Sequence, residues 1–417
     1  MSRLLKNFFE QFIVEGAIEV TSAADNRYTI GEGSGTSPAV RFADRAAELR
    51  LLSNPALALG ELFMEGRLVV TRGSIYDVLA LATRNLALQR PSRLLRMREG
   101  LSMALRRFHQ RNSKHRSKRN VAHHYDLDGR LYELFLGADR QYSCAYFDQP
   151  GQSLEEAQLA KKRHIAAKLL IEPGHRVLDI GSGWGGLALY LAERCGAEVT
   201  GITLSEEQLA VARARAQQQG LTAAVDFLVR DYRAVTDRFD RIVSVGMFEH
   251  VGVGYYDAFF SKVSDLLTDD GVMLLHSIGS IGGPCTTNPW IAKYIFPGGY
   301  TPALSEVLPA IERAGLIVTD VEILRLHYAE TLLAWRERFL ARREQVKALY
   351  NERFCRMWEF YLAACEAGFR RGGLMVFQIQ LAKRLDVVPL TRDYIAHREA
   401  ALRSQETRRP SLMVAAE

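Results

Sequence analysis

The chain has 417 residues, of which 48% are hydrophobic and 24% are charged. This balance is ordinary for a globular protein of two or three domains. No apolar run approaches the ~20 residues that cross a bilayer, and the first residues lack the apolar core of a secretory signal, so we expect a cytoplasmic protein. The net charge of +6 favours an anionic partner, either nucleic acid or a membrane surface.

The five cysteines are scattered and form no C-x-x-C pair. They are Cys144, Cys195, Cys285, Cys355 and Cys365. An odd, unpatterned set argues for free thiols and against both a disulfide framework and a structural zinc site. We therefore expect no metal.

Residues 1–90 predict a smaller N-terminal α+β domain associated with lipid or membrane, with two strands around Asn26. The first segment carries apolar residues at helical spacing on one face, namely Leu4, Leu5, Phe8, Phe9, Phe12 and Ile13. Such a face is typical of a helix packed on its own domain. The alternative is that the face rests on a membrane.

Residues 91–120 predict a basic linker. Seven Lys or Arg residues and no acidic residue lie between Arg106 and Arg119. A solvated linker has this composition, but each basic residue near an anionic leaflet also contributes roughly 1 kcal/mol of attraction. A nucleic-acid groove needs aromatic rings for base stacking, and Phe108 is the only one between Arg93 and Arg119. We therefore favour an anionic membrane and expect no nucleic acid.

Residues 121–390 alternate strands and helices, which predicts an α/β, doubly wound Rossmann-like domain, followed by a polar tail at 391–417. A short apolar strand at 176–180 runs into glycines at 181–186 and a helix at 187–194. This order brings a ligand close to backbone N–H groups at a helix N-terminus. The G-x-G-x-x-G spacing alone is weak, because dinucleotide enzymes share it.

Two details favour S-adenosylmethionine over a dinucleotide. The second strand, at 198–202, ends in Thr203, Leu204 and Ser205 rather than in the Asp or Glu of a dinucleotide site. This segment can hydrogen-bond a ribose while Ser205 caps the next helix. Asp179, two residues before Gly181, suits the cationic methionyl end of the cofactor.

Further strands are expected at 225–229, 239–245 and 271–278, with a helix at 255–267. Ligands in such sheets bind beyond the carboxyl ends of the strands. Asp231, Glu249 and His276 fall at those ends. Taken singly, His276 has the alternative of a core histidine, Cys144 of a small buried apolar residue, and Glu249 of a charge at a helix start.

The ordered motifs from about residue 121 to residue 383 resemble the cyclopropane-fatty-acid-phospholipid synthases and the related mycolic acid cyclopropane synthases. The motifs are HHYD at 123–126, QYSCAYF at 141–147, VLDIGSGWG at 177–185, TLSEEQ at 203–208, FEHVG at 248–252, HSIG at 276–279, IFPGG at 295–299, HYAET at 327–331 and YLAACEAGFR at 361–370. The resemblance implies a class I S-adenosylmethionine-dependent methyltransferase that converts the cis double bond of an unsaturated phospholipid acyl chain to a cyclopropane. The resemblance also makes a homodimer an expectation. With the basic run at 91–120, we expect a cytoplasmic enzyme peripherally associated with the inner face of the membrane.

The resemblance also assigns residues to roles. Together with the glycine turn it places the cofactor at Tyr142, Ser143, Asp179, Gly181, Gly183, Thr203, Leu204, Ser205, Gln208, Tyr232 and Arg233. It implies a bicarbonate ion at Cys144, Glu249, His276, Ile278 and Tyr328. A cysteine that matches Cys365 is traditionally marked as the active-site residue, so the expected catalytic set is Cys365, Glu249, His276, Tyr328 and Cys144.

The chemistry places its own demands on these residues. An alkene is a weak nucleophile, so it must be held against the methyl donor in a dry pocket. The resulting carbocation can be stabilised by aromatic faces, for which Tyr142, Tyr146, Phe147 and Tyr328 are candidates. A base then removes a proton from the added methyl to close the ring. Bicarbonate suits this step better than Cys365, because a thiol ionises only where its surroundings lower its pKa.

Two alternatives stay open. Loss of a different proton would give a methyl-branched alkene on the same scaffold, and a non-catalytic lipid-binding protein could retain the fold. Residues 279–301 contain five glycines and predict a lid or access port beside the site. Within this segment residues 290–296 are apolar enough to line an acyl channel. An ordinary surface loop is the alternative.

Overall fold

The computed structural model describes residues 3–32, 37–88 and 129–408. It divides into two compact units, which are described separately. The first comprises Met1–Ala104, Thr286–Pro297 and Ala329–Leu374, and the second comprises Leu105–Cys285, Gly298–Tyr328 and Met375–Glu417. The basic run at 91–120 and the HHYD motif at 123–126 lie outside the described residues.

The first unit contains a four-stranded sheet in the order β2-β1-β3-β4. Its strands are β1 (Gly16–Thr21), β2 (Arg27–Glu32), β3 (Ala39–Phe42) and β4 (Leu68–Arg72), and its early helices are α1 (Arg3–Phe12), α2 (Arg45–Ser53), α3 (Pro55–Met64) and α4 (Ile75–Leu88). Helix α1 buries Leu5 and Phe9 and packs on α2 and β2. Of the two alternatives for the first helix, packing on its own domain therefore accounts for the face that carries Leu5 and Phe9. The side chain of Leu4 is 68% exposed.

Later parts of the chain complete this unit. They are α12 (Pro289–Tyr294), α14 (His327–Ala341), α15 (Arg343–Leu349) and α16 (Glu352–Arg371). Helix α16 packs on α3 and α4, and the rings of Trp290 and Phe360 lie 4.6 Å apart in the core. The unit thus differs from the domain predicted at 1–90, because the apolar faces of α3 and α4 are covered by helices that occur much later in the sequence.

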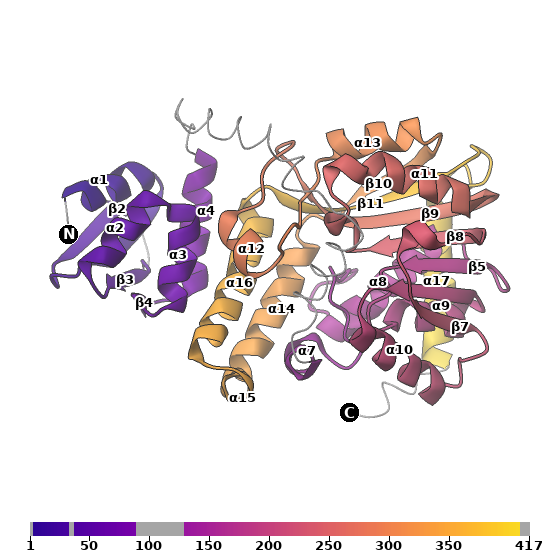
Figure 1. The fold of residues 1–417 in the computed structure, drawn as a ribbon, viewed down its shortest axis with the longest axis horizontal. Helices are drawn as coiled ribbons and strands as arrows, with labels where there is room; N and C mark the ends of the chain where they lie inside the picture. The colour runs from indigo at the N-terminus through magenta and orange to yellow at the C-terminus, as the bar shows by residue number, and fades with distance from the viewer. Residues whose placement is uncertain (1–2, 33–36, 89–128, 409–417) are drawn as a thin grey trace. The chain divides into compact units, whose positions relative to one another are not determined.

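The second unit is built on a seven-stranded sheet in the order β10-β11-β9-β8-β5-β6-β7 (Figure 1). The strands are β5 (Arg176–Ile180), β6 (Glu198–Thr203), β7 (Val225–Val229), β8 (Phe239–Val245), β9 (Leu267–Ser280), β10 (Ile317–Ile323) and β11 (Leu374–Ala382). Strands β7, β6, β5, β8 and β9 pair in parallel, and β10 pairs antiparallel to β11. This sheet confirms the doubly wound α/β fold.

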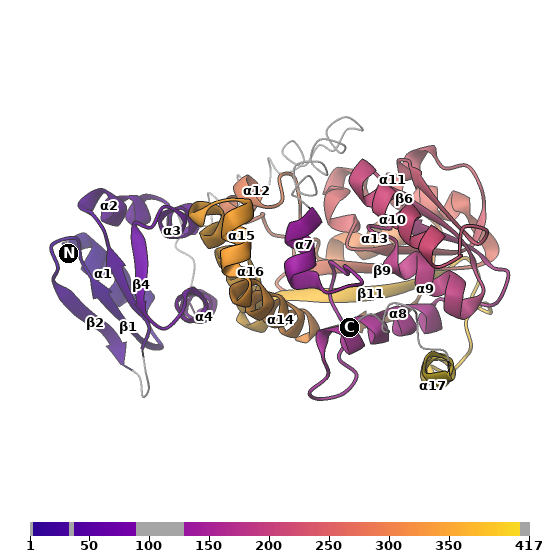
Figure 2. The same ribbon diagram turned by 90° about the horizontal axis from the view of Figure 1, so that it is seen from below.

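Helices cover both faces of this sheet. The helices of this unit are α7 (Gly129–Leu136), α8 (Leu154–Lys168), α9 (Gly186–Cys195), α10 (Glu206–Gln218), α11 (Tyr256–Leu266), α13 (Leu304–Arg313) and α17 (Asp393–Arg408). One core lies between the sheet and α11 and α13, and the other lies between the sheet and α8, α9 and α10. Figure 2 shows these layers from a second direction.

The predicted polar tail contains the ordered helix α17, which packs on α8. Arg163 of α8 pairs with Glu406 at 2.7 Å, and His164 Nδ1 lies 2.7 Å from Glu399 Oε1. Charged residues that make this segment polar therefore pair with residues of α8.

Gly201 of β6 packs closely against β7 and the turn after β5, so a substitution there tests this architecture. A Cβ at Gly201 would lie 2.6 Å from the Phe227 ring and 3.0 Å from Ser182 Cβ. We expect Gly201→Ala to destabilise the protein by about 1–3 kcal/mol, as overpacking does, and to lower the thermal unfolding midpoint by several degrees. The control is Gly254→Ala, which meets nothing within 4 Å. Equal midpoints for the two variants would contradict this packing.

Candidate active site

The turn between β5 and α9 lies where β5 meets its two parallel neighbours, β6 and β8. Gly181, Gly183 and Gly185 have φ of +89°, +54° and +83°, a region in which side chains are strained. The N–H groups of Gly181 and Ser182 both donate to the carbonyl of Ile202, at 2.9 and 3.0 Å. The turn is thereby held against the end of β6, at the edge where ligands bind in such sheets.

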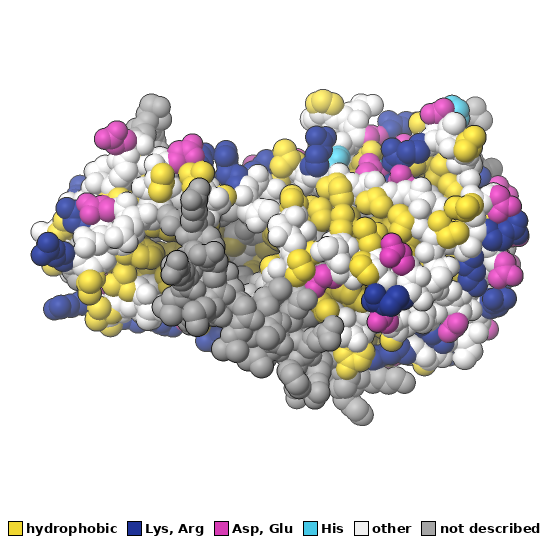
Figure 3. Space-filling model, turned by 90° about the horizontal axis from the view of Figure 1, so that it is seen from above, with side chains coloured by type: hydrophobic (Ala, Val, Ile, Leu, Met, Phe, Trp, Pro, Cys, Tyr) yellow, Lys and Arg dark blue, Asp and Glu magenta, His cyan; other side chains and the backbone are white. Residues whose placement is uncertain are grey.

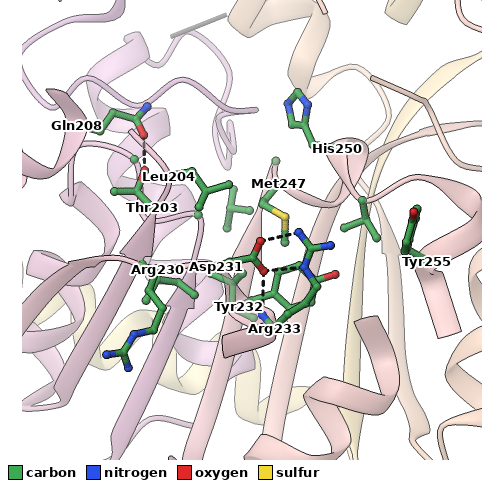
Figure 4. A pocket seen from close by; sticks show the side chains of 17 residues that line it. Thr203, Leu204, Gln208, Arg230, Asp231, Tyr232, Arg233, Met247, His250 and Tyr255 are labelled. Atoms are coloured by element: carbon green, nitrogen blue, oxygen red, sulfur yellow. Dashed lines mark hydrogen bonds and ion pairs between the residues drawn. The ribbon is translucent and has the colours of Figure 1, made fainter. Parts of the chain in front are cut away.

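A first cavity opens on one side of this turn (Figure 4). Its lining includes the predicted cofactor residues Gly181, Gly183, Thr203, Leu204, Gln208, Tyr232 and Arg233. The Thr203 hydroxyl donates to Gln208 Oε1 at 2.8 Å, which orders two polar side chains that can meet a ribose.

The charges in this cavity are largely balanced. Arg233 lies in the 3₁₀ turn η1 (Tyr232–Ala234), and its Nε donates to Asp231 Oδ1 at 2.8 Å. The guanidinium also lies 5.6 Å from the centre of the Tyr232 ring. Figure 4 shows the Arg230 guanidinium directed away from this group. Because Arg233 is already paired and Arg230 points away from it, this part of the cavity suits an uncharged nucleoside better than a pyrophosphate.

A second, more polar cavity adjoins the first and shares Gly181, Gly183 and Gln208 with it. Tyr142, Ser143 and Asp179 line it, as the cofactor assignment requires. Asp179 is 2% exposed, and its Oδ2 has no hydrogen-bond partner among the described residues. Burial raises the pKa of this carboxyl to about 7, against the lowering effect of Lys161. An unpartnered buried carboxylate fits the ammonium group of a methionyl ligand.

Ser205 contacts neither cavity. Its hydroxyl accepts a hydrogen bond from Gln208 N at 3.3 Å and caps α10. The capping role is confirmed, whereas direct contact of Ser205 with the cofactor stays a prediction.

Two members of the expected bicarbonate set meet directly. Glu249 lies in the 3₁₀ turn η2 (Phe248–His250), which is followed by η3 (Val253–Tyr255). Its Oε1 accepts from the backbone N–H of Ile278 at 2.7 Å, while Oε2 has no partner among the described residues. Burial raises the pKa of Glu249 to about 7, and the Ile278 N–H opposes this rise. Near neutral pH this carboxyl therefore exists in both protonation states.

His276 occupies β9 and is 2% exposed. Burial, with the nearby Lys161 cation, lowers the pKa of its imidazole to about 3, so the ring is neutral. The amide nitrogen of Gln378 lies 3.2 Å from His276 Nδ1. Because an amide nitrogen only donates, this contact favours the tautomer with its proton on Nε2.

The segment that carries Cys144 is held by aromatic stacking. Tyr146 stacks on His164 of α8 at 4.2 Å and on His327 at 4.9 Å. His327 Nδ1 also accepts from the N–H of Phe147 at 3.0 Å, which ties the segment to the residue beside Tyr328. Cys144 is 1% exposed, and its thiol donates to the carbonyl of Ala145 at 3.2 Å.

Cys365 lies in α16, in the first unit. Burial raises the pKa of its thiol to about 12. The thiol is therefore protonated at neutral pH, which makes it a poor base and a poor nucleophile.

The structure adds residues that sequence reasoning missed. Met247, His250 and Tyr255 line the first cavity, and Lys161 lines the second. Burial lowers the pKa of His250 to about 4, so this ring too is neutral. The positions of His250 and Tyr255 just after β8 could have signalled them, whereas nothing in the sequence separates Lys161 from Lys162.

Comparison with known proteins gives consistent results. Residues 112–379 match the family model described as mycolic acid cyclopropane synthetase. The chain is 38% identical over 380 residues to the cyclopropane-fatty-acyl-phospholipid synthase of Escherichia coli, covering 88% of this chain and 96% of the relative. It is 39% identical over 285 residues to a tuberculostearic acid methyltransferase of Mycobacterium tuberculosis, covering 65% of this chain and 66% of the relative.

A solved structure extends the likeness to the fold. It is a mycolic acid cyclopropane synthase in complex with SAH and CTAB, 35% identical, with a TM-score of 0.61, covering 63% of this chain and 97% of the other. With the family match over 112–379, it establishes that this chain belongs to the mycolic acid cyclopropane synthetase family and is an S-adenosylmethionine-dependent methyltransferase.

Proposed function

We propose that the enzyme is a cyclopropane-fatty-acyl-phospholipid synthase, which adds a methylene from S-adenosylmethionine to the cis double bond of an unsaturated phospholipid acyl chain. The observation that carries the proposal is the likeness to the Escherichia coli synthase, which extends over 96% of that enzyme. The site supports it, because the buried imidazoles of His250 and His276 are neutral, as suits a hydrocarbon substrate.

The two cavities divide the cofactor between them in this proposal. Thr203, Gln208 and Tyr232 would hold the adenosyl part in the first cavity, and Asp179 would take the methionyl ammonium in the second. When bound, S-adenosylmethionine supplies an electrophilic methyl on a sulfonium. The glycine turn would lie between the adenosyl and methionyl parts. The cofactor could approach its backbone closely, because residues 181 and 183 carry no side chains.

Stabilisation of the carbocation falls to aromatic rings near the site. Tyr146 already stacks on two imidazoles, so less of its ring face is available. Tyr142 meets Tyr132 in an edge-to-face contact at 5.3 Å and lines the second cavity, which makes it a stronger candidate.

The proton-removing step would use the set Cys144, Glu249, His276, Ile278 and Tyr328. Bicarbonate held there would supply the base. The Nε2–H of neutral His276 would donate to such an anion, and so would Glu249 from Oε2 in its protonated form, which its raised pKa of about 7 favours. Side chains in this set would orient the base without themselves accepting the proton.

We also propose that the enzyme associates peripherally with the inner face of the membrane. In the described ranges no helix is both long and apolar enough to span a bilayer. The net charge of +6 and the basic run at 91–120 favour an anionic surface. Exposed apolar side chains add to this, among them Ile281 at 67% exposure, and Figure 3 shows hydrophobic side chains gathered on one face of the second unit. A homodimer stays a prediction.

A second candidate product is a methyl-branched unsaturated acyl chain. The likeness to a tuberculostearic acid methyltransferase favours this alternative. The two reactions share the cofactor and the carbocation and differ in which proton is lost.

Mass spectrometry of lipids from a host that lacks its own synthase, with and without this protein, tests the function. We expect phospholipid acyl chains that gain the mass of one methylene group and resist ozonolysis, because a cyclopropane has no double bond. Acyl chains with the same mass gain that ozone cleaves would instead support the methyl-branched product. Unchanged lipids, with the protein folded and binding S-adenosylmethionine, would contradict both.

The identity of the base gives a further test. We expect His276→Ala and Glu249→Ala to lower kcat by ~10²–10⁴-fold, as loss of general-base assistance does, with a much smaller effect on cofactor affinity. Cys365→Ser should keep substantial activity, because its thiol is protonated. Cys355→Ser, in the same helix, is the matched control for packing. A folded Cys365→Ser enzyme that binds cofactor but does not turn over would make Cys365 the base.

A further inference from the structure

Lys161 of α8 is a buried basic residue to which the reaction proposed above assigns no role. It is 1% exposed and lines the polar cavity beside the glycine turn. Its Nζ donates to Gln141 Oε1 at 2.7 Å and to Ser143 Oγ at 2.8 Å. An ammonium group carries three donors, and the third has no acceptor among the described residues. Lys161 also forms no ion pair within 4 Å among those residues, which is costly for a buried charge.

Asp179 lines the same cavity and has the opposite sign. Its Oδ2 lacks a partner, as described above. Neither group compensates the other by a direct contact. Burial lowers the pKa of Lys161 to about 7 and raises the pKa of Asp179 to about 7, and the charge of each opposes the shift of the other. A buried cation and a buried anion that line one small polar cavity, each with an unused hydrogen-bonding position, are complementary to the carboxylate and ammonium of an α-amino acid.

The adjacent Lys162 does not share the surroundings of Lys161. Lys162 Nζ pairs with Asp139 Oδ2 at 2.7 Å, and Arg215 Nη2 pairs with Asp139 Oδ1 at 2.6 Å. Lys162 is thus already neutralised and does not line the polar cavity. Two consecutive lysines in one helix therefore have different roles.

We propose that Lys161 binds the α-carboxylate of the methionyl part of S-adenosylmethionine through its third ammonium hydrogen, opposite Asp179. The other two hydrogens position Gln141 and Ser143. Because the Ser143 hydroxyl accepts from Lys161, its own hydrogen is directed elsewhere and can donate to the same carboxylate. The proposal rests on the assignment of this cavity to the cofactor.

The test compares two ligands that differ only in this carboxylate, S-adenosylmethionine and decarboxylated S-adenosylmethionine. Their Kd values are measured by titration calorimetry for the wild type, Lys161→Met and the control Lys162→Met. A hydrogen bond to a charged group corresponds to about 10- to 100-fold in affinity. We expect the wild type to bind the decarboxylated ligand that much more weakly. Lys161→Met should lose the same factor for S-adenosylmethionine and change less than about threefold for the decarboxylated ligand.

Several outcomes would overturn the proposal. Equal weakening of both ligands by Lys161→Met would show that Lys161 only supports the fold of residues 141–143. Equal affinity of the wild type for both ligands would show that no group binds the carboxylate, and this result would refute the proposal even if Lys161→Met does not fold. Failure of the wild type to bind S-adenosylmethionine at all would refute the cofactor assignment itself.

Discussion

The carbonyl of Ile202 accepts hydrogen bonds from two successive N–H groups, those of Gly181 and Ser182. This contact joins the end of β6 to the turn after β5, and both cavities open beside that turn. It requires positive φ at Gly181 and the absence of a side chain at Gly201, where Phe227 and Ser182 approach. In the proposed cofactor site, the position of the cofactor therefore depends first on backbone geometry and then on the side chains that bind it.

Around this turn the charges are distributed unevenly. On the first-cavity side Arg233 is paired with Asp231, and His250 is neutral. In the polar cavity Asp179 and Lys161 keep unused hydrogen-bonding positions. His276 is neutral, and Glu249 has a raised pKa. In the proposed reaction this leaves fixed charge for the methionyl group and little of it beside the alkene, where a buried charge would be costly.

Periodicity and glycine placement predicted much of the fold. Strands β5, β7 and β8 have the expected bounds, because a short apolar run between turn residues leaves little choice of where the strand begins and ends. The convergence of Asp179, Thr203 and Asp231 on the two cavities was also predictable, since parallel strands deliver their carboxyl ends to one edge. Long-range packing was not predictable in this way. Helix α16 completes the unit that begins at the N-terminus. Only the folded chain shows that Lys161 is buried without an ion pair among the described residues, while Lys162 pairs with Asp139.

A crystal structure of the enzyme with S-adenosylhomocysteine tests the central claim most directly, namely that the two cavities beside the glycine turn form one cofactor site. The account predicts the adenosine against Thr203, Gln208 and Tyr232, with the homocysteine ammonium on Asp179 and its carboxylate on Lys161. Density for the nucleoside away from residues 203–208, or an amino-acid part that avoids Asp179, would contradict it.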